Sequence, residues 1–135
     1  MKRRECTGDG GLFSGTDWEA AVLKITPVQY DPTTWVLAVD GSVDLSNVAE
    51  LQEAFDALFD KGIYRIIVEM DRVAFIASAG FGCLLNARDV VIKHGGGLVF
   101  AGTNRRVREI FDLLGITSFL RFAPDLGGAL AQMGI

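Results

Sequence analysis

Short apolar runs alternate with segments of helical periodicity from about residue 36 onward, and this alternation is the strongest constraint on the fold. The run YRIIVEM, residues 64–70, is rich in β-branched residues and bounded by turn signals, which is typical of a strand covered on both faces. GLVFAG (97–102) and FLRFA (119–123) are further strand candidates. Strands that alternate with helices predict an α/β domain with a largely parallel sheet, in which residues 64–70 lie centrally.

Three helices are predicted between these strands from the spacing of their apolar residues. The first is capped by Asn47 and ends at Gly62. The second begins at Gly80 and ends at the three glycines that follow His94. The third, over 105–114, has its apolar residues on one side, so each helix has a single apolar stripe to bury against the sheet.

The two ends of the chain complete the predicted domain. Two apolar runs, about 21–30 and 35–39, flank the turn sequence DPTT and predict a hairpin that adds antiparallel edge strands. Residues 125–133 predict a short final helix, weakened by two glycines. Residues 1–15 predict a flexible tail, which leaves 16–135 as one domain. We therefore expect a mixed, mostly parallel sheet of about five strands, with helices packed mainly on one face.

Composition narrows the function classes. Half of the 135 residues are hydrophobic, which is enough for one core, and the net charge of −4 disfavours a nucleic-acid partner. Two cysteines form neither a disulfide framework nor a metal-ligand cluster, and no apolar run is long enough to span a bilayer. We expect a cytoplasmic monomer or weak dimer, with no cofactor, no metal and no direct membrane insertion.

One hydroxyl, that of Ser78, lies in the stretch FIASAGFGCLL where a strand candidate meets a helix. A nucleophile elbow would require glycine where this chain has Ile76, and the only histidine, His94, is roughly 24 Å away along a helix that rises 1.5 Å per residue. The glycines that follow lack the spacing and the lysine of a phosphate-binding loop. The sequence therefore predicts no enzyme.

Two interpretations of Ser78 remain open from position alone. Its hydroxyl could cap the helix, which contributes about 1 kcal/mol. It could also accept a phosphoryl group, because unpaired N–H groups and the macrodipole favour negative charge at a helix start. Phosphorylation adds about −1.5 to −2 charges, and such a charge could abolish the docking of a partner that covers this glycine-lined surface.

The chain resembles the anti-sigma factor antagonists, a family of bacterial regulators built on the STAS domain, from about Trp35 to Met133. The resemblance rests on GSVD (41–44), on VAFIASAGFGCLL (73–85), and on HGGGLVFAGTNRRVREIFDLLGI (94–116). It implies a small sheet with helices on one side. It also implies that the chain binds a serine kinase that is itself an anti-sigma factor, which frees the sigma factor. The resemblance further implies that the kinase uses ATP to phosphorylate the antagonist, and that the phosphorylated antagonist is then released.

By position, the family's phosphorylated serine falls on Ser78. The acidic residue that usually precedes it is Ala77, and the hydroxyl residue that often follows it is Ala79. The domain could thus belong to a branch that binds without a phosphorylation cycle, as a scaffold or a transporter component. That is the alternative function.

The family's docking mode predicts a contact surface at neighbouring strand ends. It comprises Asp40, Gly41, Ser42, Asp44, Ala77, Ala79, Gly80, Phe81, Thr103 and Asn104. Asp44 is about equally suited to capping the first helix, Phe81 could be core, and Asn104 could cap the third helix. Cys83 is expected to be packed.

Overall fold

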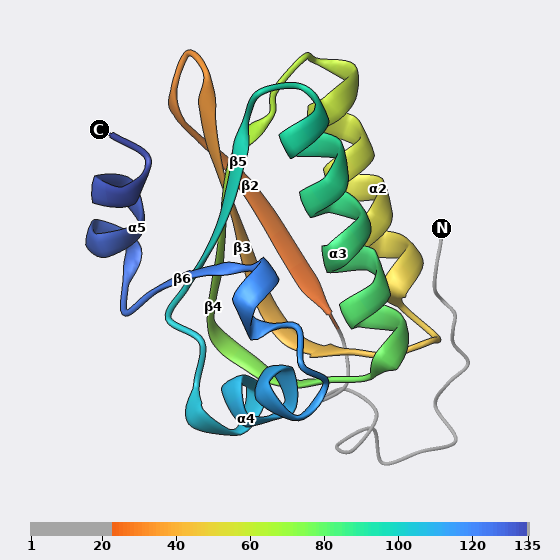
Figure 1. Ribbon diagram of the computed structural model, residues 1–135. Coiled ribbons are helices and arrows are strands. Elements are labelled where there is room, and N and C mark those ends of the chain that lie inside the picture. Colours follow the sequence, from red (N-terminus) through yellow and green to blue (C-terminus); the bar gives the residue numbers. More distant parts are fainter. Residues whose placement is uncertain (1–22, 135) are drawn as a thin grey trace.

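The computed structural model describes residues 23–134, which form one five-stranded sheet with helices on both faces (Figure 1). In spatial order the strands are β2 (Lys24–Asp31), β3 (Thr34–Val43), β4 (Arg65–Ile76), β5 (Gly97–Ala101) and β6 (Arg121–Ala123). β2 pairs antiparallel with β3, and every other pair is parallel. The predicted mixed sheet with β4 at its centre is confirmed. The tail predicted over 1–15 lies outside the described residues.

The helices divide unequally between the two faces of the sheet. They are α2 (Val48–Asp60), α3 (Ser78–Lys93), α4 (Arg105–Leu113) and α5 (Leu126–Gln132). α2 and α3 lie side by side on one face, whereas α5 is by itself on the other (Figure 1). The prediction that helices cover mainly one face is confirmed. The last strand is shorter than predicted, because Thr117–Phe119 form a 3-10 turn, η2, and β6 begins only at Arg121.

The larger core lies between the sheet and helices α2, α3 and α4, and it includes Leu37, Phe55, Leu84 and Phe111. These side chains are fully or almost fully buried, which is the main source of stability for a domain of this size. A smaller core on the opposite face joins α5 to β3, β4, β5 and β6. Both apolar faces of the central strands are therefore covered.

Helix α5 forms in spite of its two glycines because side chains at both ends hold it. The Asp125 carboxylate accepts the N–H of Gly128 at 2.8 Å at its start. At its end, the Arg65 guanidinium donates to the Met133 carbonyl at 2.5 Å. Ala129, between them, is fully buried against the sheet.

The predicted turn and helix-stop signals are confirmed. The Asp31 carboxylate accepts the N–H groups of Thr33 and Thr34 at 2.9 and 2.7 Å in the β2–β3 turn. These bonds, chiefly that from Thr33, hold the pKa of Asp31 below its ordinary value. Gly62 and Gly95, which follow α2 and α3, both have φ of +77°, a conformation that favours glycine.

Candidate functional site

Ser78 is exposed and is the first residue of α3, two residues before the helix start predicted at Gly80. The N-cap position belongs to Ala77, and no side chain caps this helix. The interpretation of Ser78 as a helix cap is therefore wrong, because its hydroxyl forms no hydrogen bond with the backbone of the first turn. What remains is an exposed hydroxyl at the amino end of a sixteen-residue helix.

The start of α3 is fixed by contacts with β3. The N–H of Ala77 donates to the carbonyl of Val43 at 2.8 Å. Gly80 is buried, and a Cβ built on it would lie 2.6 Å from Cγ2 of Ile76 and 2.9 Å from Cγ1 of Val43. Only glycine lets the helix backbone come this close to the strands, so Gly80 sets the position of Ser78.

The first turn of α3 offers unpaired donors. Among the described residues, neither the N–H of Ser78 nor that of Ala79 has a hydrogen-bond acceptor, as expected for the first turn of any helix. The side chains on either side of Ser78 are methyl groups, from Ala77 and Ala79. A negative charge on Ser78 would meet N–H groups and the positive end of the helix dipole without a neighbouring carboxylate.

The β3–α2 turn lies beside this helix start, and hydrogen bonds hold its backbone. The Asp44 carboxylate accepts the N–H and the hydroxyl of Ser46 at 2.9 and 2.5 Å, so it closes the turn and does not cap α2. Asn47 occupies the N-cap position without capping: its side chain accepts the N–H of Asp44 and donates to the carbonyl of Ser42. Gly41 has a φ of 121°, which fits glycine at the end of β3.

The β5–α4 loop brings Thr103 and Asn104 to the same edge of the sheet. Asn104 caps α4, as predicted, by accepting the N–H of Val107 at 2.9 Å. It also donates to the carbonyl of Val73 on β4 at 2.7 Å, so its side chain serves the fold. The hydroxyl oxygen of Thr103 is buried and, in the part of the chain that the structure describes, has no hydrogen-bond partner.

Phe81, which we predicted as a partner contact, is a core residue. Its side chain is 4 % exposed and packs edge-to-face on Phe111, with ring centroids 4.6 Å apart. Cys83 is also buried, and its thiol donates to Gln52 at 3.5 Å. Burial, with a smaller contribution from Asp56, raises the pKa of Cys83 to about 11, so the thiol stays protonated at neutral pH.

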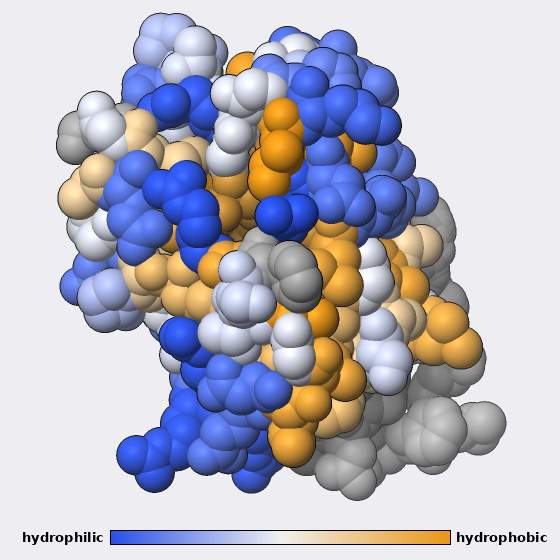
Figure 2. Space-filling model, in the orientation of Figure 1, coloured by the Kyte–Doolittle hydropathy of each residue, from blue (hydrophilic) through white to orange (hydrophobic). Residues whose placement is uncertain are grey.

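Two exposed apolar side chains lie near Ser78, and the sequence analysis singled out neither of them as an apolar contact, although the predicted contact turn, residues 40–46, contains Leu45. Leu45, in the β3–α2 turn, is 82 % exposed, and Phe75, near the end of β4, is 44 % exposed. Figure 2 shows hydrophobic surface at the lower end of the molecule, where Figure 1 draws α4, the start of α3 and the β3–α2 turn. The signal for Leu45 was available, since an apolar residue within the polar turn sequence VDLSN has no strand or helix face to occupy.

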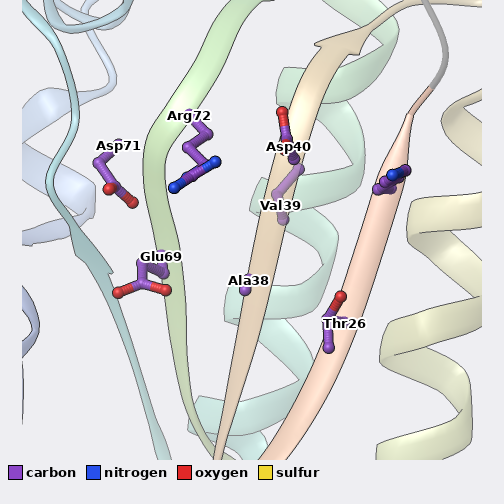
Figure 3. A pocket seen from close by; sticks show the side chains of 8 residues that line it. Thr26, Ala38, Val39, Asp40, Glu69, Asp71 and Arg72 are labelled. Carbon is purple, nitrogen blue, oxygen red and sulfur yellow. The ribbon is translucent and has the colours of Figure 1, made fainter.

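A hollow of about 380 Å³ lies on the other side of the sheet, away from α2 and α3 (Figure 3). Of the predicted residues only Asp40 lines it, between Lys24 on β2 and Arg72 on β4, which are its partners across the strands. Lys24, Asp40 and Arg72 thus form a row of alternating charge across three strands. Oppositely charged neighbours across strands attract one another, so this row is explained without a bound ligand. We therefore place the candidate site at Ser78.

Over residues 23–134, no group of three or more His, Cys, Asp or Glu side chains could hold a metal ion. None of the helices in that range is both long and apolar enough to cross a bilayer.

Comparison with known proteins identifies the fold and the family. The STAS domain matches this chain over residues 25–129. BtrV of Bordetella bronchiseptica, named provisionally as an anti-sigma factor antagonist, is 28 % identical over 81 % of this chain and 93 % of its own length. An anti-sigma factor antagonist from Mycobacterium paratuberculosis superposes with a TM-score of 0.73 at 19 % identity, covering 85 % of this chain and 97 % of its own.

A further structural neighbour was solved in a phosphorylated state. Phosphorylated SpoIIAA, a cell fate determinant of Bacillus, has a TM-score of 0.65 at 18 % identity, covering 81 % of this chain and 98 % of its own. The sequence match and the shared fold agree with the resemblance drawn from the motifs around Ser78. The chain belongs to the STAS domain family and, within it, is similar to the anti-sigma factor antagonists.

Proposed function

We propose that this chain is a cytoplasmic anti-sigma factor antagonist whose binding is controlled by phosphorylation of Ser78. In its unmodified form it binds an anti-sigma factor that is also a serine kinase, and so releases the sigma factor for transcription. The kinase supplies the ATP, and the antagonist carries no cofactor and performs no catalysis. The observation that carries the proposal is the exposed hydroxyl of Ser78 at the first residue of α3, beside a hydrogen-bonded turn.

The geometry allows a phosphate on Ser78 without harm to the fold. The free N–H groups of Ser78 and Ala79 and the positive end of the α3 dipole stabilise the added negative charge. A partner that covers the surface in the unmodified state would have to bury that charge without a matching cation. Burying an unpaired charge is costly, so the complex dissociates while the antagonist remains folded.

Ala77 and Ala79 define the kind of contact that this surface makes. With methyl groups on both sides of Ser78, a docked partner meets an apolar, uncharged strip at the helix start. The contact surface further includes Gly41, Ser42, Asp44 and Thr103, whereas Asp40 lines the hollow on the other face of the sheet. The Phe81 and Asn104 side chains serve packing and capping, and the absence of a side chain at Gly80 lets α3 approach β3. The fold shared with phosphorylated SpoIIAA supports a phosphorylated state for a domain of this shape.

The proposal is tested with the anti-sigma factors encoded in the same genome, each purified and mixed with the full chain. We expect one of them to bind and, once ATP is added, to transfer phosphate to Ser78, located by mass spectrometry of peptides. Binding with no phosphate on Ser78 would favour the alternative of a scaffold without a phosphorylation cycle. Binding by none of them would refute the proposed function.

A further inference from the structure

Leu45 is among the most exposed large apolar side chains of the described residues, at 82 %. It stands at the tip of the β3–α2 turn, and hydrogen bonds hold the backbone on both sides of it. The carbonyl of Asp44 accepts the N–H of Val48 at 2.8 Å, and the Asp44 carboxylate accepts that of Ser46. The leucine therefore stays in water because the turn places it there, and burying it on a partner requires no rearrangement of the turn.

The turn leads directly into a helix surface of one charge. α2 contains four acidic residues and no basic residue along its length. All four are exposed: Glu50, Glu53, Asp56 and Asp60. An exposed leucine thus borders an acidic helix face, a combination that matches an apolar pocket flanked by lysine and arginine.

This surface is continuous with the site at Ser78. Leu45 follows Val43 by two residues, and the Val43 carbonyl accepts the N–H of Ala77. The Val43 side chain also packs against the backbone of Gly80 in the first turn of α3. A partner that covers Ser78 from the side of α2 will therefore also cover Leu45.

We propose that Leu45 is the apolar anchor of the partner-binding surface, and that the partner lays a basic surface along α2. This inference rests on the proposed function, and it names the chemistry of the anti-sigma factor that the site accepts. A second copy of this chain is the poorer occupant. Two copies joined through this face would set like carboxylates against one another, in a protein whose net charge is already −4.

The test uses the anti-sigma factor that binds the unmodified full chain, with affinity measured by calorimetry at low and high salt. Leu45→Ala should weaken binding at least about tenfold, equivalent to about 1.4 kcal/mol. Ile92→Ala is the matched control, because Ile92 is 52 % exposed near the far end of α3, and it should leave the affinity unchanged. Because Leu45 and Ile92 are both exposed, both variants should have the same unfolding temperature as the parent chain.

A second pair of variants tests the attraction between the acidic face of α2 and the basic surface of the partner. Glu50→Lys combined with Glu53→Lys should weaken binding and reduce its dependence on salt, because the attraction to a basic surface is lost. Glu109→Lys, an exposed carboxylate on α4, should do neither.

Two results would overturn the anchor while leaving the proposed function in place. One is unchanged affinity for Leu45→Ala, and the other is a larger loss for Leu113→Ala, at an 85 % exposed leucine on α4. If no anti-sigma factor binds the parent chain, the proposed function itself fails and the anchor fails with it.

Discussion

The backbone N–H of Ala77 donates to the carbonyl of Val43 at 2.8 Å, and this single bond joins the start of α3 to the end of β3. It sets the exposed hydroxyl of Ser78 beside the hydrogen-bonded turn that carries Leu45. Two segments more than thirty residues apart in the sequence thereby form one surface. A phosphate on Ser78 would therefore lie within the surface that a partner covers, where an unpaired charge is costly to bury.

Gly80 and Gly82 provide a matched pair for testing how closely α3 approaches the strands. Gly80→Ala should destabilise the fold by about 1–3 kcal/mol, because its Cβ would clash with Ile76 and Val43. Gly82→Ala meets nothing within 4 Å, and in a helix it should stabilise the fold by up to about 1 kcal/mol. Urea unfolding of both variants measures the difference, and equal effects would show that the close approach at Gly80 is absent in solution.

Ser78 and Asn104 distinguish a modifiable hydroxyl from a structural cap. Ser78→Ala should change the free energy of unfolding by less than about 0.5 kcal/mol, because the hydroxyl caps nothing. Asn104→Ala should cost about 1–2 kcal/mol, because it removes the cap of α4 and the bond to the Val73 carbonyl. A loss of 1 kcal/mol or more on Ser78→Ala, on the scale typical of helix caps, would restore the interpretation that we reject.

The alternating pattern predicted a mostly parallel sheet with residues 64–70 at its centre, because that apolar run had to be buried on two faces, but it did not reveal how far β4 extends. Asp71 and Arg72 interrupt the apolar run, and both occupy exposed positions of a strand that continues to Ile76. The start of α3 was missed because Ala77 provides no capping side chain.

The candidate site was predictable only in part. Helical spacing alone does not determine whether the aromatic side chain after Gly80 is buried. Phe81 is buried because it packs on Phe111, and the position of Phe111 depends on where α4 lies. Asn47 was expected as a cap and Asp44 as either a cap or a partner contact, but their bonds close a turn whose shape is set by contacts within residues 42–48. The exposure of Leu45 was not predicted, because periodicity identifies buried residues and gives no information about exposed ones.

Cys83 predicts how stability depends on pH. In the folded chain its pKa is raised to about 11, whereas in the unfolded chain the thiol ionises near its ordinary value of 9.0. The unfolded state therefore releases its proton first, and the free energy of unfolding should fall as the pH rises from about 9 to about 11. Urea unfolding of the parent and of Cys83→Ala across this range checks it. The decline should be shallower in the variant, and parallel curves would contradict the assigned burial.

The most direct test of the switch is the affinity of one anti-sigma factor for three forms of the full chain: unmodified, phosphorylated on Ser78, and Ser78→Ala. We predict that phosphorylation weakens binding at least about tenfold, a change of about 1.4 kcal/mol, while Ser78→Ala binds like the unmodified chain and no longer responds to ATP. Equal affinities for the unmodified and phosphorylated forms would contradict the claim that charge on Ser78 decides binding.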